Sequence, residues 1–135
     1  MTRSLKSESV ALREEGDLIL ARQRVRERAA ELGFGILDST KIVTAASELG
    51  RNTLIHGGGG TMQLEVLADE TRKGLRLTFE DHGPGISDLA QAMTDGFTTR
   101  RGMGLGLGGS KRLVNEFELS SRPGEGTRVR VTRWT

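Results

Sequence analysis

The chain has 135 residues, the size of one domain, and its hydrophobic fraction of 35% and charged fraction of 28% are ordinary for a globular protein. A net charge of +2, with the positive residues spread along the chain and only four Phe and one Trp for stacking, argues against a nucleic-acid partner. The sequence has no cysteine, no apolar run near the roughly 20 residues of a membrane span and no signal-peptide pattern. We therefore expect a single cytoplasmic domain over residues 1–135, with no membrane partner.

The first part of the chain predicts a strand followed by two helices. Residues 9–13 alternate weakly and predict a short edge strand, and residues 17–32 predict a helix that ends at a glycine. Asp38 or Ser39 can cap a second helix over residues 40–57. The apolar stripes are Leu18, Val25, Ala29 and Leu32 in the first helix, and Ile42, Ala45, Ala46, Leu49 and Thr53 in the second.

A hairpin is predicted next. Four glycines at 57–60 predict a flexible turn, and residues 61–68 and 74–81 alternate as two strands. The apolar faces of these strands are Met62, Leu64 and Val66 in the first and Leu75, Leu77 and Phe79 in the second. About twenty-five residues rich in Gly, Thr, Asp and Arg follow Asp81, with a short helical turn predicted at 88–93. So long a connection inside a compact domain is often a functional lid.

The last part predicts a helix over residues 110–117 and two strands around a turn at 123–126, with Val129, Val131 and Arg133 alternating against polar neighbours. The predicted order is β-α-α-β-β-loop-α-β-β. This order favours an α+β fold, a two-layer sandwich with the helices on one face of a mixed sheet.

The stretch "GMGLGLGGSKRLV" begins at Gly102 and places five glycines directly before the predicted helix. Its G-x-G-x-x-G spacing is not preceded by the strand that a dinucleotide fold needs, and its Ser110-Lys111 order reverses that of a P-loop. Glycines before a helix nevertheless let backbone N–H groups approach a phosphate. A merely flexible loop explains the stretch equally well when it is taken alone.

Two further stretches suggest a nucleotide site. In "EDHGPGISD", a strand delivers Asp81 to a turn in which Gly83 and Gly85 permit positive φ and close approach, so the acid can accept a hydrogen bond from an exocyclic amine. In "ELGRN", Glu48 and Asn52 are four residues apart and share one helix face, where their oxygens can hold Mg²⁺ and orient a nucleophile. Taken alone, the first stretch also fits a plain turn and the second a solvated helix face.

The three stretches, in this order, resemble the GHKL ATPase superfamily, named for gyrase, Hsp90, histidine kinases and MutL, whose nucleotide site is the Bergerat fold. "ELGRN" resembles its N box, "DHGPGI" its first glycine box and "GMGLGLG" its second. Within the superfamily the whole chain resembles the small serine/threonine switch kinases of the RsbT type and, more distantly, the anti-sigma factor kinases of the RsbW and SpoIIAB type.

The resemblance implies a site for ATP and Mg²⁺. Asn52 would coordinate the metal ion, Glu48 would act as general base, and Asp81 would bind the adenine amino group with Gly85 beside the base. We also expect a cation before the second glycine box to steady the γ-phosphate, although exposed lid arginines are an equal alternative. The remaining expected nucleotide-binding residues are Gly83, Thr127, Gly102, Gly104, Gly106, Gly108, Arg100 and Arg101.

The resemblance also implies the partners. A sensor histidine kinase needs an acceptor histidine on a dimerisation helix, and the only histidines are His56 and His82, at a helix end and in a glycine box. The RsbT likeness implies a serine/threonine protein kinase that phosphorylates a STAS-domain antagonist in a partner-switching stress pathway and activates a PP2C-type phosphatase by binding it. The alternative is an anti-sigma factor whose nucleotide-gated function is to sequester a sigma factor.

Overall fold

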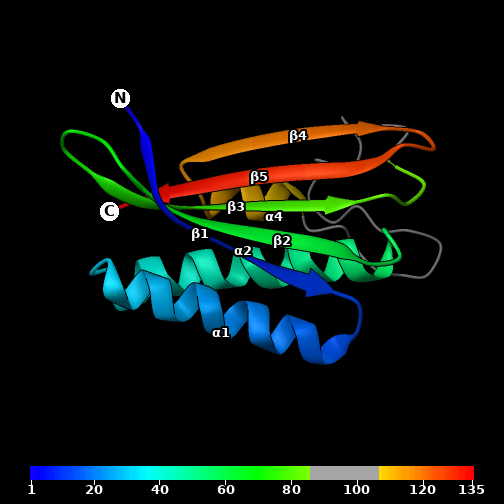
Figure 1. Cartoon of the computed structure of the whole chain (residues 1–135), viewed down its shortest axis with the longest axis horizontal. Coiled ribbons are helices and arrows are strands. Elements are labelled where there is room, and N and C mark those ends of the chain that lie inside the picture. Colours follow the sequence, from blue (N-terminus) through cyan, green and yellow to red (C-terminus); the bar gives the residue numbers. More distant parts are fainter. Residues whose placement is uncertain (86–106) are drawn as a thin grey trace.

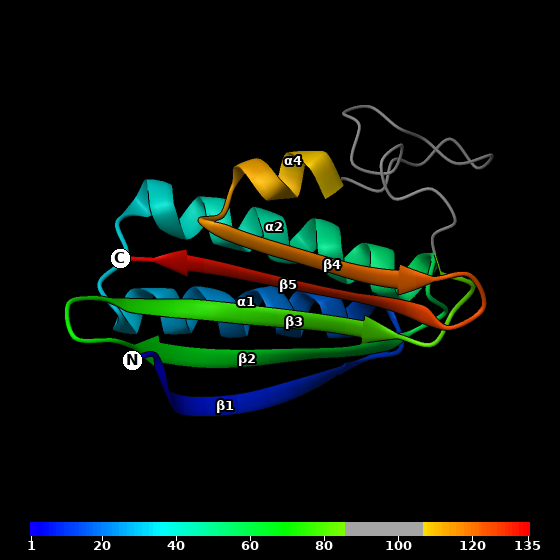
Figure 2. The same cartoon turned by 90° about the horizontal axis from the view of Figure 1, so that it is seen from above.

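The computed structural model describes residues 1–85 and 107–135, which form two layers (Figures 1 and 2). One layer is a five-stranded sheet, and helices α1, α2 and α4 lie together on one of its faces. No helix in the described part of the chain is long and apolar enough to cross a membrane. The elements in chain order are β1 (Arg3–Leu12), α1 (Glu15–Glu31), α2 (Ile36–Ile55), β2 (Gly60–Ala68), β3 (Lys73–Asp81), α4 (Leu107–Arg112), β4 (Glu116–Arg122) and β5 (Gly126–Trp134).

The sheet has the strand order β1-β2-β3-β5-β4, and every neighbouring pair is antiparallel. The prediction of α+β layers with helices on one face is confirmed, but the prediction of a mixed sheet is wrong. The reason lies in the first connection, because α1 and α2 run out and back and return the chain to the end that it left. Leu12, the last residue of β1, therefore lies opposite Gly60, the first residue of β2.

The core lies between the sheet and the helices. The period-two faces predicted for the central strands are confirmed, as are the apolar stripes of both long helices. Outside the core, α1 is also tied to the edge strand, because the Arg28 guanidinium donates to Glu8 of β1 at 2.9 Å. The central core residues are Leu18, Val25, Ala29, Ile42, Ala46, Leu49, Met62, Leu64, Leu75, Leu77, Phe79, Val129 and Val131.

Two element boundaries differ from prediction at the N-terminal side. Strand β1 is ten residues long, twice the predicted length, because the polar positions before residue 9 also pair with β2. Helix α2 begins at Ile36, one turn earlier than expected, since the Ser39 N–H already donates to the Gly35 carbonyl at 2.9 Å. Asp38 is therefore inside the first helical turn, where its carboxylate accepts a hydrogen bond from Arg133.

A third boundary differs near the C-terminus. The helix expected over 110–117 is α4 at Leu107–Arg112, and Phe117 belongs to β4 instead. Phe117 lies opposite Val131 in the ladder and packs against the core, so pairing with β5 outweighs the helical pattern of the local sequence. The turn at 123–126 and the final strand agree with prediction.

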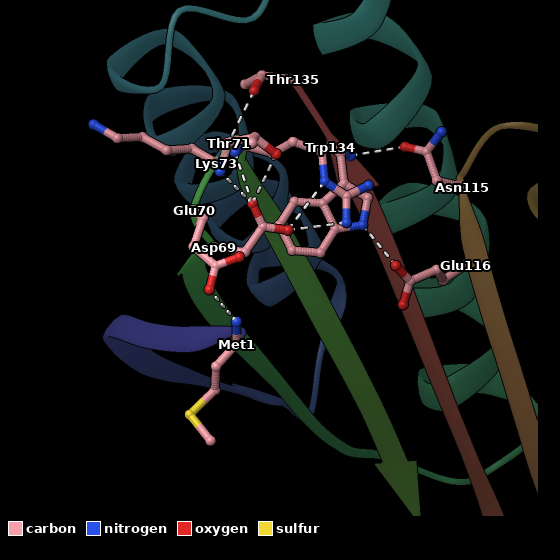
Figure 3. Close-up of polar contacts among 10 residues, drawn as sticks. Met1, Asp69, Glu70, Thr71, Lys73, Asn115, Glu116, Trp134 and Thr135 are labelled. Carbon is pink, nitrogen blue, oxygen red and sulfur yellow. Dashed lines mark hydrogen bonds and ion pairs between the residues drawn. The ribbon is translucent and has the colours of Figure 1, made fainter.

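The chain termini lie at one end of the sheet, where side chains close the structure (Figure 3). The Arg72 guanidinium stacks 4.0 Å from the centre of the Trp134 ring, and its backbone N–H donates to the Asp69 carboxylate at 2.7 Å. Trp134 Nε1 donates to Glu116 at 2.6 Å. Backbone and side-chain hydrogen bonds with the 70–72 turn lower the pKa of Asp69 to about 2. We call the residues Asp69, Arg72, Glu116 and Trp134 the terminal corner.

Candidate nucleotide-binding site

A pocket lies at the opposite end of the sheet from the terminal corner. It is bounded by the C-terminal half of α2, the end of β3, the beginning of β5 and the first residue of α4. Gly85 and Leu107, which flank the segment 86–106, both line it, so the chain enters and leaves that segment at the pocket. The lining residues are Leu49, Asn52, Thr53, His56, Gly57, Asp81, Gly85, Leu107, Thr127 and Val129.

Asp81 is the last residue of β3, and backbone groups fix its carboxylate. Oδ1 accepts the N–H of Gly83 at 2.9 Å and the N–H of Thr127 at 3.2 Å. No donor among the described residues reaches Oδ2. A half-buried carboxylate at the wall of an apolar pocket thus keeps one oxygen for a ligand, and an exocyclic amine is a suitable donor for it.

The Thr127 side chain forms a hydroxyl pair with Ser121 of β4. Ser121 Oγ lies 2.9 Å from the Gly126 carbonyl oxygen, to which it donates, and 2.9 Å from Thr127 Oγ1. Either hydroxyl can be the donor in the Ser121–Thr127 pair, and the pair fixes the position of the Thr127 side chain. Strand β4 therefore orders a hydroxyl at the pocket wall, beside the backbone N–H that holds Asp81.

Helix α2 places Asn52 and Glu48 differently with respect to the pocket. Asn52 is half-buried and lines it, whereas Glu48 is exposed one turn earlier and is not among the lining residues. Both side chains lie on the same side of the helix because they are four residues apart. This arrangement leaves the Glu48 carboxylate open to a group that arrives from solvent beside the pocket.

The glycines of the first glycine box serve different purposes. Gly85 has φ +75°, as expected for a turn, but Gly83 does not have a positive φ and is required instead for close approach. A Cβ on Gly83 would lie 2.7 Å from the Gly57 carbonyl oxygen. The expectation of a positive φ at Gly83 is therefore wrong, although the expectation of close packing there is confirmed.

Of the remaining predicted site residues, Gly108 lies in the part of the chain that the structure describes and the others do not. Gly108 is half-buried in α4, next to the pocket residue Leu107, and this helix begins three residues before the predicted start at Ser110. Sequence reasoning missed some lining residues. Among them, His56 was detectable because it lies four residues after Asn52, on the same helix face. The predictions for Arg100, Arg101, Gly102, Gly104 and Gly106 fall outside the described residues.

The donor set fits ATP and Mg²⁺. Leu49, Leu107 and Val129 would provide apolar walls for a flat base, and the Asp81 carboxylate would provide an acceptor for its amino group. No group of three or more His, Cys, Asp or Glu side chains that could hold a metal ion occurs within residues 1–85 and 107–135. Mg²⁺ needs no such group, because it commonly takes one or two protein oxygens and fills its shell with phosphate and water. The Asn52 carboxamide oxygen is a ligand of this kind.

The fold and this pocket define a nucleotide-binding domain, and comparison with known families identifies its class. Residues 37–134 match the family of histidine kinase-, DNA gyrase B- and HSP90-like ATPases. The chain belongs to this family, and the GHKL resemblance of the sequence is thereby confirmed. Membership of an ATPase family means that the domain binds a nucleotide.

Individual relatives narrow the class. The chain is 47% identical over 125 residues to the serine/threonine-protein kinase RsbT of Bacillus subtilis, covering 93% of this chain and 94% of that one. It is 35% identical over 119 residues to an anti-sigma F factor of a Thermoanaerobacter species, covering 84% and 82%. The fold matches a Mycobacterium tuberculosis structure with RsbU and RsbW domains, with a TM-score of 0.65, 21% identity and coverage of 95% of this chain and 32% of that one.

Proposed function

We propose that the protein is an ATP-dependent serine/threonine protein kinase of the RsbT type that acts in a partner-switching pathway. The observation that carries the proposal is the site geometry. Asp81 offers a base one carboxylate oxygen that has no donor within residues 1–85 and 107–135, and Asn52 and Glu48 follow in order along one side of α2 toward solvent. The 47% identity to RsbT over nearly the whole of both chains supports phosphoryl transfer as the use of this site.

In the proposed reaction, Asp81 Oδ2 accepts a hydrogen bond from the adenine amino group and so fixes the position of the nucleotide. The Glu48 carboxylate takes the proton of an attacking serine or threonine hydroxyl. The hydroxyl oxygen then forms a bond to the γ-phosphorus of ATP, while the bond from that phosphorus to the β–γ bridging oxygen breaks and ADP leaves. Mg²⁺ held by Asn52 would supply neutralisation of the phosphate charge.

The exposure of Glu48 agrees with a protein acceptor rather than a small molecule. A base inside the pocket would be covered by the nucleotide, whereas a base on the solvent side of Asn52 remains accessible to a hydroxyl on another protein's surface. The proposal also includes the second glycine box and the two arginines before it. The lid hinge and the phosphate-binding loop would be formed by Gly102, Gly104, Gly106 and Gly108, and the cations for the γ-phosphate would be Arg100 and Arg101.

The proposed acceptor is a STAS-domain antagonist in the cytoplasm, and the proposed downstream partner is a PP2C-type phosphatase that the kinase activates by binding. A second function is favoured by the 35% identity to an anti-sigma F factor. In that alternative, nucleotide-gated capture of a sigma factor is the output, and phosphorylation of an antagonist only releases the captured protein.

Transfer of label from γ-labelled ATP tests the proposal. Wild-type protein and Glu48→Ala are incubated with Mg²⁺ and a lysate of the source cells. We expect one small protein to be labelled on serine or threonine by wild type and at least about 100-fold less by Glu48→Ala, with ATP affinity unchanged, because general bases contribute about 10²–10⁴ in rate. Glu27→Ala is the matched control, since Glu27 is a partly exposed helical carboxylate with a long, 3.7 Å ion pair to Arg24.

Two results would contradict the proposal. Undiminished transfer by Glu48→Ala would mean that another group takes the proton. Absence of any labelled protein, together with ATP-dependent retention of a sigma factor on the immobilised chain, would favour sequestration as the function.

A further inference from the structure

We propose that Gly57 is a positioning residue that sets the position of Asp81 Oδ2 and thereby the preference of the site for adenine over 6-oxo purines. This inference rests on the proposed contact between Asp81 and the base. It goes further, because it assigns a role to a residue that the proposed reaction does not use and that we predicted only as part of a flexible glycine turn.

The packing around Gly57 leaves no room for a side chain. A Cβ added there would lie 2.5 Å from both Cβ and Oδ2 of Asp81, and closer still to Cγ. A Cβ atom essentially never lies within 3.0 Å of a heavy atom outside its own residue and the two chain neighbours. The Asp81 carboxylate is therefore in direct contact with the backbone of Gly57, along the side that carries Oδ2.

Backbone conformation does not explain why residue 57 is a glycine. Positive φ angles occur at Gly58 and Gly59, the next two residues, but not at Gly57. Alanine is thus compatible with the φ angle at position 57, and the contact with Asp81 is the feature that excludes it. The four glycines of this turn have separate roles, and Gly57 belongs to the pocket wall.

Gly57 is itself held in place from two sides. Its N–H donates to the Asn52 carbonyl at 3.0 Å, which extends the hydrogen bonding of α2, and its backbone packs against Gly83. The Gly57 backbone cannot move away from the Asp81 carboxylate unless the C-terminal end of α2 or the turn after β3 also moves. The backbone of Gly57 therefore limits how far the Asp81 carboxylate can move toward it.

The two halves of the carboxylate are thus constrained by different means. Two backbone N–H groups hold Oδ1, while Gly57 limits the movement of Oδ2. A single acceptor at a fixed position favours a base with a 6-amino donor. It disfavours a base with a 6-oxo group, because two acceptors would then face each other. A shift of Oδ2 by the width of a methyl group would remove this discrimination.

The test compares ATP with inosine triphosphate, which differs by a 6-oxo group, in calorimetric titrations of wild type, Gly57→Ala and Gly16→Ala. We expect Gly57→Ala to bind ATP about 10- to 100-fold more weakly while its inosine triphosphate affinity changes little, so that the base preference collapses. Gly16→Ala is the control, because Gly16 also lacks a positive φ and a Cβ there would meet nothing within 4 Å. It should keep both affinities.

Three outcomes would overturn the inference. Wild-type base preference in Gly57→Ala would show that the Cβ is accommodated without moving Asp81, and equal weakening of both nucleotides would show a general loss of the pocket. Asp81→Asn separates the two levels of the proposal. If Asp81→Asn keeps the wild-type preference for ATP, the proposed adenine contact is wrong and the inference is wrong as well. If Asp81→Asn loses this preference while Gly57→Ala keeps it, only the role of Gly57 is wrong.

A stability comparison covers the case in which Gly57→Ala folds poorly. Asp81→Gly removes all three atoms that the new Cβ would meet. We expect Gly57→Ala to lower the unfolding temperature in the wild-type background and to lower it much less in the Asp81→Gly background. Equal effects in both backgrounds would contradict a direct contact between the two residues.

Discussion

The two ends of the sheet are built in opposite ways. At the terminal corner, the Trp134 side chain stacks on the Arg72 guanidinium and donates a hydrogen bond to the Glu116 carboxylate. At the pocket end, backbone N–H groups and glycines hold Asp81, and one of its oxygens is left without a donor among the described residues. Side chains that bind one another stabilise a fold but have little capacity left for a ligand. A side chain that is fixed by backbone groups alone stays available to a ligand, and this distinguishes the candidate site from the terminal corner.

The largest effect on stability is expected at the terminal corner. Trp134→Ala removes a ring that is only 9% exposed, together with its stacking on Arg72 and its bond to Glu116. We predict that the free energy of unfolding falls by about 3 kcal/mol or more, while ATP affinity at a temperature where the variant is folded stays within about twofold. Denaturant unfolding and calorimetry measure the two quantities.

Trp134→Phe serves as the graded control. It keeps a ring beside Arg72 but loses the Nε1–H···Glu116 hydrogen bond, so we expect a loss of about 1 kcal/mol. If Trp134→Ala weakened ATP binding as strongly as a change in the pocket does, the two ends would be coupled and the comparison between them would fail.

A smaller effect is predicted for the pH dependence of stability. The pKa of Asp69 is lowered to about 2 from 3.8, so its contribution is complete above about pH 4 and is lost as the pH falls toward 2. Asp69→Asn keeps a carbonyl oxygen for the turn but removes the charge. Its unfolding free energy should therefore approach that of wild type between pH 4 and pH 2.

The neighbouring carboxylate provides the control for this measurement. Glu70 is exposed and pairs with the amino terminus, which is also exposed, so Glu70→Gln should follow the wild-type curve. A constant difference between wild type and Asp69→Asn down to pH 2 would contradict the assignment of the shift to the 70–72 turn.

Sequence patterns predicted the parts of the fold that bury apolar residues. The central strands and both long helices were predicted because one face of each is buried and their apolar spacing shows it. The full length of β1 was not predictable in this way, since most of its residues are exposed at the sheet edge. The start of β4 was missed because local helical spacing continues past Arg112, and only the distant pairing with β5 decides the conformation.

The candidate site was predicted in part for a similar reason. Asp81 and Asn52 were found because polar groups at a strand end and on a helix face stand out locally. Gly57 was not, because a glycine required by contact is indistinguishable in sequence from its neighbours Gly58 and Gly59, which are required by backbone conformation. Only the distance to Asp81, twenty-four residues further along the chain, separates these cases.

The most direct test of the account is calorimetric titration of ATP into wild type and Asp81→Asn. In the variant, the carboxamide oxygen can still accept the N–H groups of Gly83 and Thr127, which turns the NH₂ group toward the site of the adenine amine. Two donors would then face each other. We predict a loss of affinity of about 100-fold or more with an unchanged unfolding temperature. Wild-type affinity in Asp81→Asn would show that the base is bound elsewhere and would contradict the central claim.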